Sequence, residues 1–258
     1  MVGFKAATFK SILITGASSG IGTALAEALA APDVRLVLGG RAVDRLQAVA
    51  ATCRSRGAEV ALESVDVTDR AKTAAWIAES DRTRPLDLVI ANAGISGGTL
   101  GGNENDAQTR EIFAVNLDGV LNTVLPILPA MLQRGRGQIG IMSSLAGYRG
   151  YPGAPAYCGS KAAVRVWGEA MRGEVAARGV GISIIMPGYV KSPMTAVNDF
   201  PMPFLMPAER AASIVKRGLE ANRARIAFPF PTAFVAWFIG MLSPAITDPI
   251  LARLPKKG

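Results

Sequence analysis

Short apolar runs alternate with helical patterns along almost the whole chain, and this alternation limits the possible folds more than any other feature. A run that is apolar at every position, rather than at every second one, is typical of a strand with both faces buried. We therefore expect an α/β fold in which a doubly wound, mostly parallel seven-stranded sheet carries helices on both faces. The predicted strands are 10–15, 34–39, 58–65, 86–91, 138–143, 180–186 and 225–228, and the predicted helices are 20–31, 42–56, 69–80, 106–134, 155–178 and 207–222.

Length and composition favour a single domain. The chain has 258 residues, half of them apolar, which suffices for one substantial core. We assign the domain to residues 1–228 and an apolar C-terminal tail to residues 229–258. The N-terminus lacks the pattern of a signal peptide, and the two cysteines, Cys53 and Cys158, provide no disulfide framework or metal-ligand set. We therefore expect a reduced, cytoplasmic protein without a metal site.

The chain contains no histidine. This absence excludes Ser-His-Asp hydrolysis, histidine metal ligation and histidine general-base chemistry. Any acid–base chemistry must therefore use Tyr, Lys, Asp or Glu. The net charge of +8 does not indicate a nucleic-acid partner, because the basic residues are scattered and are not interleaved with aromatic residues in one patch.

A glycine-rich turn, Thr15-Gly16-Ala17-Ser18-Ser19-Gly20-Ile21-Gly22, joins the first predicted strand to the first helix. Glycines at this place allow a sharp turn and let the backbone approach a pyrophosphate closely. The free N–H groups and the positive dipole of the helix N-terminus attract the phosphates. The turn therefore predicts a Rossmann-type dinucleotide-binding domain; the alternative is a tight strand–helix turn that happens to use glycine.

Tyr157 and Lys161 lie four residues apart on a predicted helix, and side chains at this spacing share one helix face. A free tyrosine has a pKa of about 10, too high for acid–base work near neutrality. A cation about 4 Å away stabilises the phenolate by about 4 kcal/mol at an effective dielectric constant near 20. The pair predicts a catalytic phenol, but the same spacing also occurs on ordinary helices, where Tyr borders a core and Lys is solvated.

The glycine spacing of the turn is G-x-x-x-G-x-G, not the more common G-x-G-x-x-G. Further motifs follow it along the chain: Asp66-Val67, Asn92-Ala93-Gly94, Asn116, Ser144, Tyr157 with Lys161, and Pro187-Gly188 followed by Ser192. Together with Thr15 to Gly22, these motifs have the order and spacing of the short-chain dehydrogenase/reductase family, which the chain resembles from about residue 8 to 228. The resemblance implies an oxidoreductase that transfers a hydride between a nicotinamide cofactor and a carbonyl or alcohol.

The resemblance also implies the catalytic roles. Tyr157 protonates a carbonyl oxygen as general acid, or takes the proton from an alcohol in the reverse direction. Lys161 lowers the pKa of Tyr157 and holds the nicotinamide ribose. Ser144, rather than its neighbour Ser143, binds the substrate oxygen. Asn116 holds a water that relays protons through Lys161, although a buried helix asparagine bonded to the main chain fits the sequence equally well.

The cofactor contacts follow from the same resemblance. Asp66 accepts a hydrogen bond from the adenine amine, and Asn92-Ala93-Gly94 lies under the adenosine half. Val190 and Ser192 contact the nicotinamide carboxamide, although family members usually have Thr at the position of Ser192. The predicted cofactor-binding residues are Gly16, Ser18, Ser19, Gly20, Ile21, Gly22, Arg41, Asp66, Val67, Asn92, Ala93, Gly94, Tyr157, Lys161, Pro187, Gly188, Val190 and Ser192.

The end of the second predicted strand, Gly39-Gly40-Arg41, favours NADP(H) over NAD(H). Similar members that prefer NAD carry an acidic residue at the position of Gly40, where it binds the ribose 2′-hydroxyl and repels a 2′-phosphate. The guanidinium of Arg41 suits a phosphate, and Ser18 or Ser19 can add a hydroxyl contact. The alternative is that Arg41 is only the solvated start of a helix.

Two apolar segments lie outside the strand–helix pattern. In this family the segment after the sixth strand, here 189–206, covers the substrate, and its Met and Phe residues favour a lipophilic carbonyl or alcohol of ketone, acyl, retinoid or steroid type. The tail 229–258 packs on the domain or on a partner subunit, lies at a membrane surface, or does neither. Its basic flanking residues are Arg223, Arg225, Arg253, Lys256 and Lys257.

Members of this family commonly form dimers or tetramers through their two longest helices, here 106–134 and 155–178. We therefore expect a homodimer or homotetramer, cytoplasmic or peripheral on a membrane surface. Two other functions stay open, a non-catalytic NADP-sensing regulator and a lipid-binding module on the same fold. Cys158, next to the predicted catalytic tyrosine, is either a small apolar filler or an oxidant-sensitive thiol.

Overall fold

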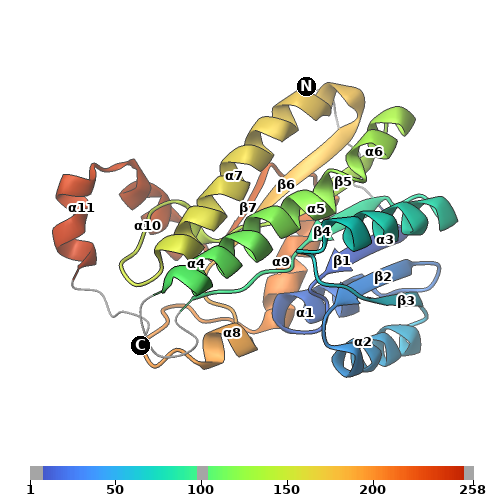
Figure 1. The fold of residues 1–258 in the computed structure, drawn as a ribbon, viewed down its shortest axis with the longest axis horizontal. Coiled ribbons are helices and arrows are strands. Elements are labelled where there is room, and N and C mark those ends of the chain that lie inside the picture. The colour runs from blue at the N-terminus through green and yellow to red at the C-terminus, as the bar shows by residue number, and fades with distance from the viewer. Residues whose placement is uncertain (1–7, 98–103, 253–258) are drawn as a thin grey trace.

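A computed structural model describes residues 8–97 and 104–252, and within these ranges one parallel sheet carries helices on both of its faces (Figure 1). The strand order is β3-β2-β1-β4-β5-β6-β7, and every neighbouring pair is parallel. The predicted fold class is confirmed. The strands are β1 (Ser11–Thr15), β2 (Arg35–Gly40), β3 (Glu59–Ser64), β4 (Leu88–Ala91), β5 (Gly137–Met142), β6 (Val180–Pro187) and β7 (Arg225–Phe228).

Two layers of helices bury the two faces of this sheet. In β1, Ile12 and Ile14 point into one core cluster and Leu13 points into the other, and all three are at most 1% exposed. This two-sided burial explains why the strands are apolar at nearly every position. One layer contains α1 (Gly20–Leu29), α2 (Val43–Ser55) and α9 (Ala208–Glu220), and the other contains α3 (Arg70–Thr83), α5 (Gly119–Val124), α6 (Leu128–Arg134) and α7 (Pro155–Val175).

The stretch 106–134, which we expected to be one helix, is divided. It consists of α4 (Asp106–Phe113), a π-helical turn η1 (Ala114–Asp118), α5 and α6. The break before α6 coincides with Pro126 and Pro129, which lack the N–H that a continuous helix needs. Among the described residues only this stretch is long and apolar enough to span a membrane, but half of its most apolar window is buried, as in a core helix.

The strand order reverses between β1 and β4, and this reversal positions the site. The chain leaves β1 towards α1 on one face of the sheet and leaves β4 towards α4 and α5 on the other (Figure 1). The two connections diverge and open a crevice at the carboxyl ends of the strands, where ligands bind in such sheets. The glycine-rich turn after β1 and the segment Asn92–Gly94 after β4 border this crevice.

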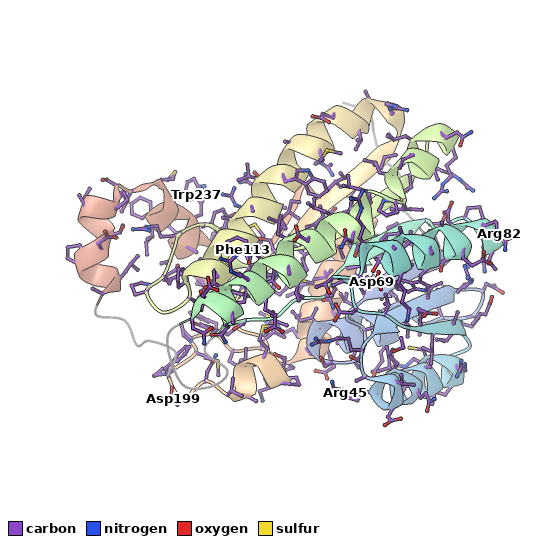
Figure 2. All side chains as sticks on the ribbon, in the orientation of Figure 1. Arg45, Asp69, Arg82, Phe113, Asp199 and Trp237 are labelled. Carbon is purple, nitrogen blue, oxygen red and sulfur yellow. The ribbon has the colours of Figure 1, made fainter. Side chains whose placement is uncertain are left out.

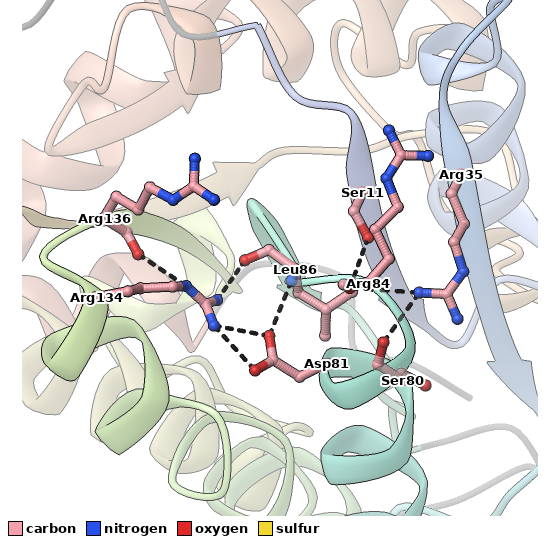
Figure 3. Close-up of polar contacts among 8 residues, drawn as sticks. All are labelled: Ser11, Arg35, Ser80, Asp81, Arg84, Leu86, Arg134 and Arg136. Carbon is pink, nitrogen blue, oxygen red and sulfur yellow. Dashed lines mark hydrogen bonds and ion pairs between the residues drawn. The ribbon is translucent and has the colours of Figure 1, made fainter.

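Polar side chains form hydrogen bonds near the amino ends of the strands, at the side of the sheet opposite the crevice (Figure 3). Asp81 at the end of α3 accepts two hydrogen bonds of 2.9 Å from Arg134 Nη1 and one of 2.8 Å from the Leu86 main-chain N–H. Arg134 Nη2 donates to the Leu86 carbonyl at 2.6 Å. Nearby, Arg35 donates to the Ser80 carbonyl at 2.9 Å. These contacts fix the amino ends of the central strands and lie away from the crevice.

The tail forms two helices, α10 (Phe230–Met241) and α11 (Pro244–Leu251), at the end of the molecule opposite α2 (Figure 1). Ala233 and Ala236 of α10 are buried in the same core cluster as α7. Arg149 anchors α11, because its guanidinium donates to Thr247 Oγ1 at 3.1 Å and pairs with Asp248 at 2.5 Å. One face of the tail therefore packs on the domain; Arg253, Lys256 and Lys257 lie outside the described residues.

Candidate active site

A cavity of about 860 Å³ occupies the crevice at the carboxyl ends of the strands. Every residue predicted to bind the cofactor lines it, and so do three of the four predicted catalytic residues. The exception is Asn116. The cavity-lining residues that were predicted are Gly16, Ser18, Ser19, Gly20, Ile21, Gly22, Arg41, Asp66, Val67, Asn92, Ala93, Gly94, Ser144, Tyr157, Lys161, Pro187, Gly188, Val190 and Ser192.

The glycine-rich turn requires glycine for steric reasons. Gly16 has a φ of +65°, and a Cβ there would lie 2.8 Å from Ala93 Cα. A Cβ on Gly22 would lie 2.2 Å from the Gly16 carbonyl oxygen. The Asn92 amide fixes the turn by donating to the carbonyls of Thr15 and Gly16, at 3.0 and 3.1 Å. The turn is therefore held rigidly against β4.

The first helix opens towards the cavity with free donors. Ser19 is the N-cap residue of α1, and its side chain makes no capping hydrogen bond. The first-turn N–H groups of α1 are thus left without a side-chain acceptor. Together with the positive dipole end they form a site that fits a pyrophosphate. These residues therefore fit a dinucleotide cofactor.

The end of the cavity that lies next to β2 and β3 carries a cation and an anion that face each other. Arg41 Nη1 lies 3.7 Å from Asp66 Oδ2, and both side chains are largely exposed. Burial raises the pKa of Asp66, but hydrogen bonds from the Thr68 N–H and hydroxyl and the charge of Arg41 outweigh it, so the pKa is lowered overall. Arg45, on α2, also lines the cavity and was missed in the sequence because no motif marks it. Two guanidinium groups thus border this end.

The predicted catalytic side chains meet where α7 begins. Lys161 Nζ lies 5.9 Å from the centroid of the Tyr157 ring and donates to the Met142 carbonyl at 2.9 Å. The Ser144 hydroxyl hydrogen-bonds to the Tyr157 phenol. The Ser143 hydroxyl instead donates to the Lys161 carbonyl at 2.7 Å and so fixes the α7 backbone. Of the two serines, Ser144 is thus the one beside the phenol.

Burial shifts the pKa values of both Tyr157 and Lys161. It raises the pKa of Tyr157, and the hydrogen bond from Ser144 offsets only part of that shift. From the sequence we predicted a lowered pKa for Tyr157, because the spacing indicates the nearby Lys161 charge but not the loss of hydration on burial. Burial also lowers the pKa of Lys161 from 10.5 to about 8. At neutral pH the phenol is therefore protonated and the amine is charged.

Asn116 lies behind the cavity wall, in the π-helical turn η1, and is fully buried. Its amide exchanges two hydrogen bonds of 2.8 Å with the main chain of Ile95 and donates to Ser160 Oγ at 3.1 Å. Gly94 separates it from Lys161, since a Cβ on Gly94 would lie 3.1 Å from Asn116 Oδ1 and 3.2 Å from Lys161 Nζ. Asn116 thus fixes the segment after β4 against α7.

The segment after β6 borders the other end of the cavity. The Gly188 N–H donates to the Phe228 carbonyl at 2.8 Å, and Val190 forms a β-bridge with Met206. Ser192 is the N-cap of the short helix α8 (Pro193–Ala196) and forms a capping box with Thr195. The Ser192 hydroxyl therefore has a local structural role in addition to its place on the cavity wall.

Glu104 is a site residue that the sequence did not reveal. Its carboxylate accepts hydrogen bonds from the main-chain N–H groups of Ala156, at 2.5 Å, and Tyr157, at 3.2 Å. The N-cap residue of α7 is Ala154, which cannot cap with its side chain. Glu104 supplies that cap from 52 residues away. It thereby fixes the helical turn that carries the phenol.

The remaining cavity wall is mostly apolar or aromatic. It comes from the segment after β6, from the loop before α7 and from the tail. The thiol of Cys158 also lines the cavity, but it is 3% exposed and burial raises its pKa, which disfavours the reactive thiolate. The lining residues of this part include Tyr151, Tyr189, Met194, Phe200, Pro201, Pro203, Phe204, Val235, Ile239 and Leu251.

A doubly wound sheet, an open helix N-terminus at its switch point and a phenol beside an ammonium define a dinucleotide-binding oxidoreductase site. The chain belongs to the short-chain dehydrogenase family, whose family model, described as short chain dehydrogenase, matches residues 10–200. Members of this family use a nicotinamide cofactor, act on small molecules and typically form oligomers.

Individual relatives agree with this assignment. The chain is 37% identical over 248 residues to an uncharacterized oxidoreductase of Myxococcus xanthus, covering 96% of this chain and 98% of that protein. The fold matches a short-chain dehydrogenase from Sphingobium yanoikuyae in complex with NADPH, with a TM-score of 0.79, 23% identity and coverage of 95% and 96%. It also matches a short-chain dehydrogenase from Mycobacterium paratuberculosis bound to NAD, with a TM-score of 0.75, 22% identity and coverage of 87% and 96%.

Proposed function

We propose that this protein is an NADP(H)-dependent oxidoreductase that reduces a lipophilic carbonyl compound, or oxidises the corresponding alcohol. The observation that carries the proposal is the position of Tyr157. Its phenol lies beside Ser144 and Lys161 in a cavity with the dinucleotide-type residues at one end and an apolar wall at the other. A carbonyl compound bound against the apolar wall would therefore share one cavity with the Tyr157 phenol as acid, the Ser144 hydroxyl as hydrogen-bond donor and the cofactor site.

The chain's own residues supply the proton and the orientation, and the bound nicotinamide supplies the hydride. Tyr157 acts as general acid: its O–H donates a proton to the carbonyl oxygen as negative charge develops there. The raised pKa keeps that proton on the phenol at neutral pH. The Ser144 hydroxyl donates a hydrogen bond to the same oxygen. Lys161 presents its charge to the cofactor ribose and to the resulting phenolate.

The preference for NADP(H) rests on the residues that follow β2. Gly40 offers no carboxylate for a ribose 2′-hydroxyl, and a Cβ there would lie 3.2 Å from Ser18 Oγ. Arg41 and Arg45 line the cavity at this end, and Arg41 is the more direct candidate for a 2′-phosphate. The short-chain dehydrogenase from Sphingobium yanoikuyae, which is similar in fold, was solved with NADPH, whereas that from Mycobacterium paratuberculosis was solved with NAD, so the proposed preference rests on Gly40 and Arg41.

The substrate class rests on the apolar wall. Phe200, Phe204, Val235, Ile239 and Leu251 bring side chains from the segment after β6 and from both tail helices to one cavity. Such a wall favours a ketone, acyl, retinoid or steroid type of substrate, which can bury a large apolar surface. We further propose a cytoplasmic homodimer or homotetramer, in which α4, α5 and α7 form the subunit contact.

A panel of ketones tests the proposal directly. NADPH consumption is measured with lipophilic ketones and with small water-soluble ketones of equal carbonyl reactivity, and each is repeated with NADH. We expect a higher kcat/KM for the lipophilic ketones with NADPH. No consumption with any carbonyl or alcohol, together with normal NADPH binding, would leave a cofactor-sensing regulator as the better description.

A further inference from the structure

The tail helix α10 has two faces with different surroundings. Towards the domain, Ala233 and Ala236 are buried, and Ala236 and Ile239 line the cavity. The other side presents large apolar side chains to solvent, at helical positions i, i+4, i+7, i+8 and i+11. We call these residues the α10 aromatic face: Phe230 (79% exposed), Phe234 (51%), Trp237 (40%), Phe238 (47%) and Met241 (57%).

The α10 aromatic face is held in this exposed position. The aromatic rings contact one another along the helix surface. The centroid of the Phe234 ring lies 6.2 Å from that of Phe230, 5.8 Å from that of Trp237 and 6.4 Å from that of Phe238. A Cβ on Gly240 would lie 2.7 Å from the Tyr148 carbonyl oxygen. This close approach, together with the burial of Ala233 and Ala236, packs the opposite side of α10 on the domain and leaves the aromatic side facing outwards. In Figure 2, Trp237 lies at the α10–α11 end of the molecule, away from Arg82.

The charges of the tail favour an anionic partner. No charged residue occurs from Ile226 to Thr247, and Asp248 is neutralised by its 2.5 Å contact with Arg149. In the sequence, Arg253, Lys256 and Lys257 follow shortly after α11. The C-terminal tail thus has an aromatic face without carboxylates, followed in the sequence by three basic residues. The one acid of the tail, Asp248, is already paired with Arg149. An anionic lipid surface complements both features.

We propose that the α10 aromatic face docks on a lipid surface that carries anionic headgroups. Trp and Phe side chains suit the boundary between headgroups and acyl chains. With 12 residues α10 is too short to span a bilayer, which needs about 20, so it lies in the plane of the interface. A second copy is a less suitable occupant, because a two-fold contact would present the same acid-free face to itself and so offer no negative charge to the three basic residues that follow α11 in the sequence.

Docking in this way would also place the cavity close to the membrane. Ala236 and Ile239 line the cavity from the same helix that carries the exposed aromatic residues. Lipophilic carbonyl compounds concentrate in membranes, so the enzyme would meet its substrate at that surface. This part of the proposal rests on the proposed function, whereas lipid docking itself does not depend on turnover.

Vesicle binding by the full chain tests the proposal. We compare co-sedimentation with vesicles of phosphatidylcholine and with vesicles containing a quarter phosphatidylglycerol, at 0.1 and 0.5 M salt. The test variant is Phe234→Gln/Phe238→Gln. The matched control is Val43→Gln/Val197→Gln, which removes two apolar side chains that are 45% and 51% exposed and lie outside the tail and outside the proposed subunit contact. We expect wild type and control to bind the anionic vesicles, and the test variant to bind at least tenfold more weakly.

Three further measurements test whether the α10 aromatic face binds lipid: Trp237 emission, sedimentation of Tyr157→Phe, and light scattering. Trp237 emission should shift to shorter wavelength on binding, and Trp237→Phe should lose that shift while Trp76 and Trp167 remain. Tyr157→Phe should sediment like wild type, which separates docking from the proposed chemistry. Undiminished sedimentation of the test variant would overturn the proposal by assigning binding to the basic residues alone. So would the absence of wild-type binding, or light scattering that shows the test variant dissociating an oligomer held by this face.

Discussion

Lys161 Nζ lies 5.9 Å from the centroid of the Tyr157 ring, on the same face of α7, and both side chains line the cavity. Burial shifts the pKa values of both groups in directions that suit the proposed carbonyl reduction. The phenol of Tyr157 keeps its proton because burial raises its pKa, and the Lys161 ammonium becomes the group that titrates first, with a pKa lowered from 10.5 to about 8.

The pH dependence of reduction follows from Lys161. Below pH 8 the amine is charged and can bind the cofactor ribose, and above pH 8 it loses its proton, so kcat/KM for reduction should fall as the pH rises through about 8. The free energy of unfolding should change in the opposite direction. Between about pH 8 and 10.5 Lys161 is protonated in the unfolded chain but not in the folded chain, so its contribution makes the folded state more stable as the pH rises. A kcat/KM profile that stays flat from pH 7 to 9.5 would contradict the assignment.

Tyr157→Phe removes the proton donor and leaves the ring. We expect kcat to fall by about two to four orders of magnitude, because the carbonyl oxygen loses its general acid and general acid catalysis typically contributes that much. NADPH binding should be unchanged within about twofold, since the glycine-rich turn and Arg41 are untouched. Steady-state kinetics and fluorescence titration measure the two quantities. Substantial residual turnover would remove Tyr157 from the catalytic role.

Arg41→Ala tests the cofactor preference. Losing one charge-assisted hydrogen bond to a phosphate costs about 2 kcal/mol, so the Kd for NADPH should rise roughly thirtyfold while the Kd for NADH stays the same. Gly40→Asp should reverse the preference by adding a carboxylate for the 2′-hydroxyl. Arg210→Ala, which removes an exposed cation of α9 outside the cavity lining, is the control. Tighter binding of NADH than NADPH by the wild type would refute the preference.

Much of this structure was predictable because it depends on local patterns. The strands β1, β2, β4, β5 and β6 are buried on both faces, and the glycine turn with Asn92 and Gly94 marks the switch point at fixed spacing. The contribution of Glu104 was not predictable, because it caps α7 across 52 residues and no motif requires it. The pKa direction of Tyr157 was missed for a similar reason: spacing gives the distance to Lys161 but not the depth of burial. The exposed face of α10 depends on how Gly240 packs on Tyr148.

Glu104→Ala should loosen the turn that carries Tyr157. The lost cap costs about 0.5 to 2 kcal/mol of stability, and kcat should fall more than KM rises because the phenol is less well positioned. Gly97→Ala provides an independent variant, because its Cβ would lie 2.4 Å from Glu104 Cγ and displace the carboxylate. Glu104→Gln keeps an acceptor oxygen and should retain most of the activity. Equal kcat in wild type and both alanine variants would show that the cap is irrelevant to catalysis.

Asp81→Ala should destabilise the fold without affecting the site. The side chains of Asp81 and Arg134 are 15% and 18% exposed, and the substitution leaves Arg134 Nη1 and the Leu86 N–H without the carboxylate that accepts from them (Figure 3). Removing one partner of such a pair costs about 3 kcal/mol, which thermal or urea unfolding would detect. The Kd for NADPH should not change, because these residues lie at the amino ends of the strands. Glu79→Ala, on the same helix, breaks the exposed pair with Arg82 and should leave stability unchanged. Equal stability of the two variants would show that the Asp81 contacts contribute no more than a surface pair.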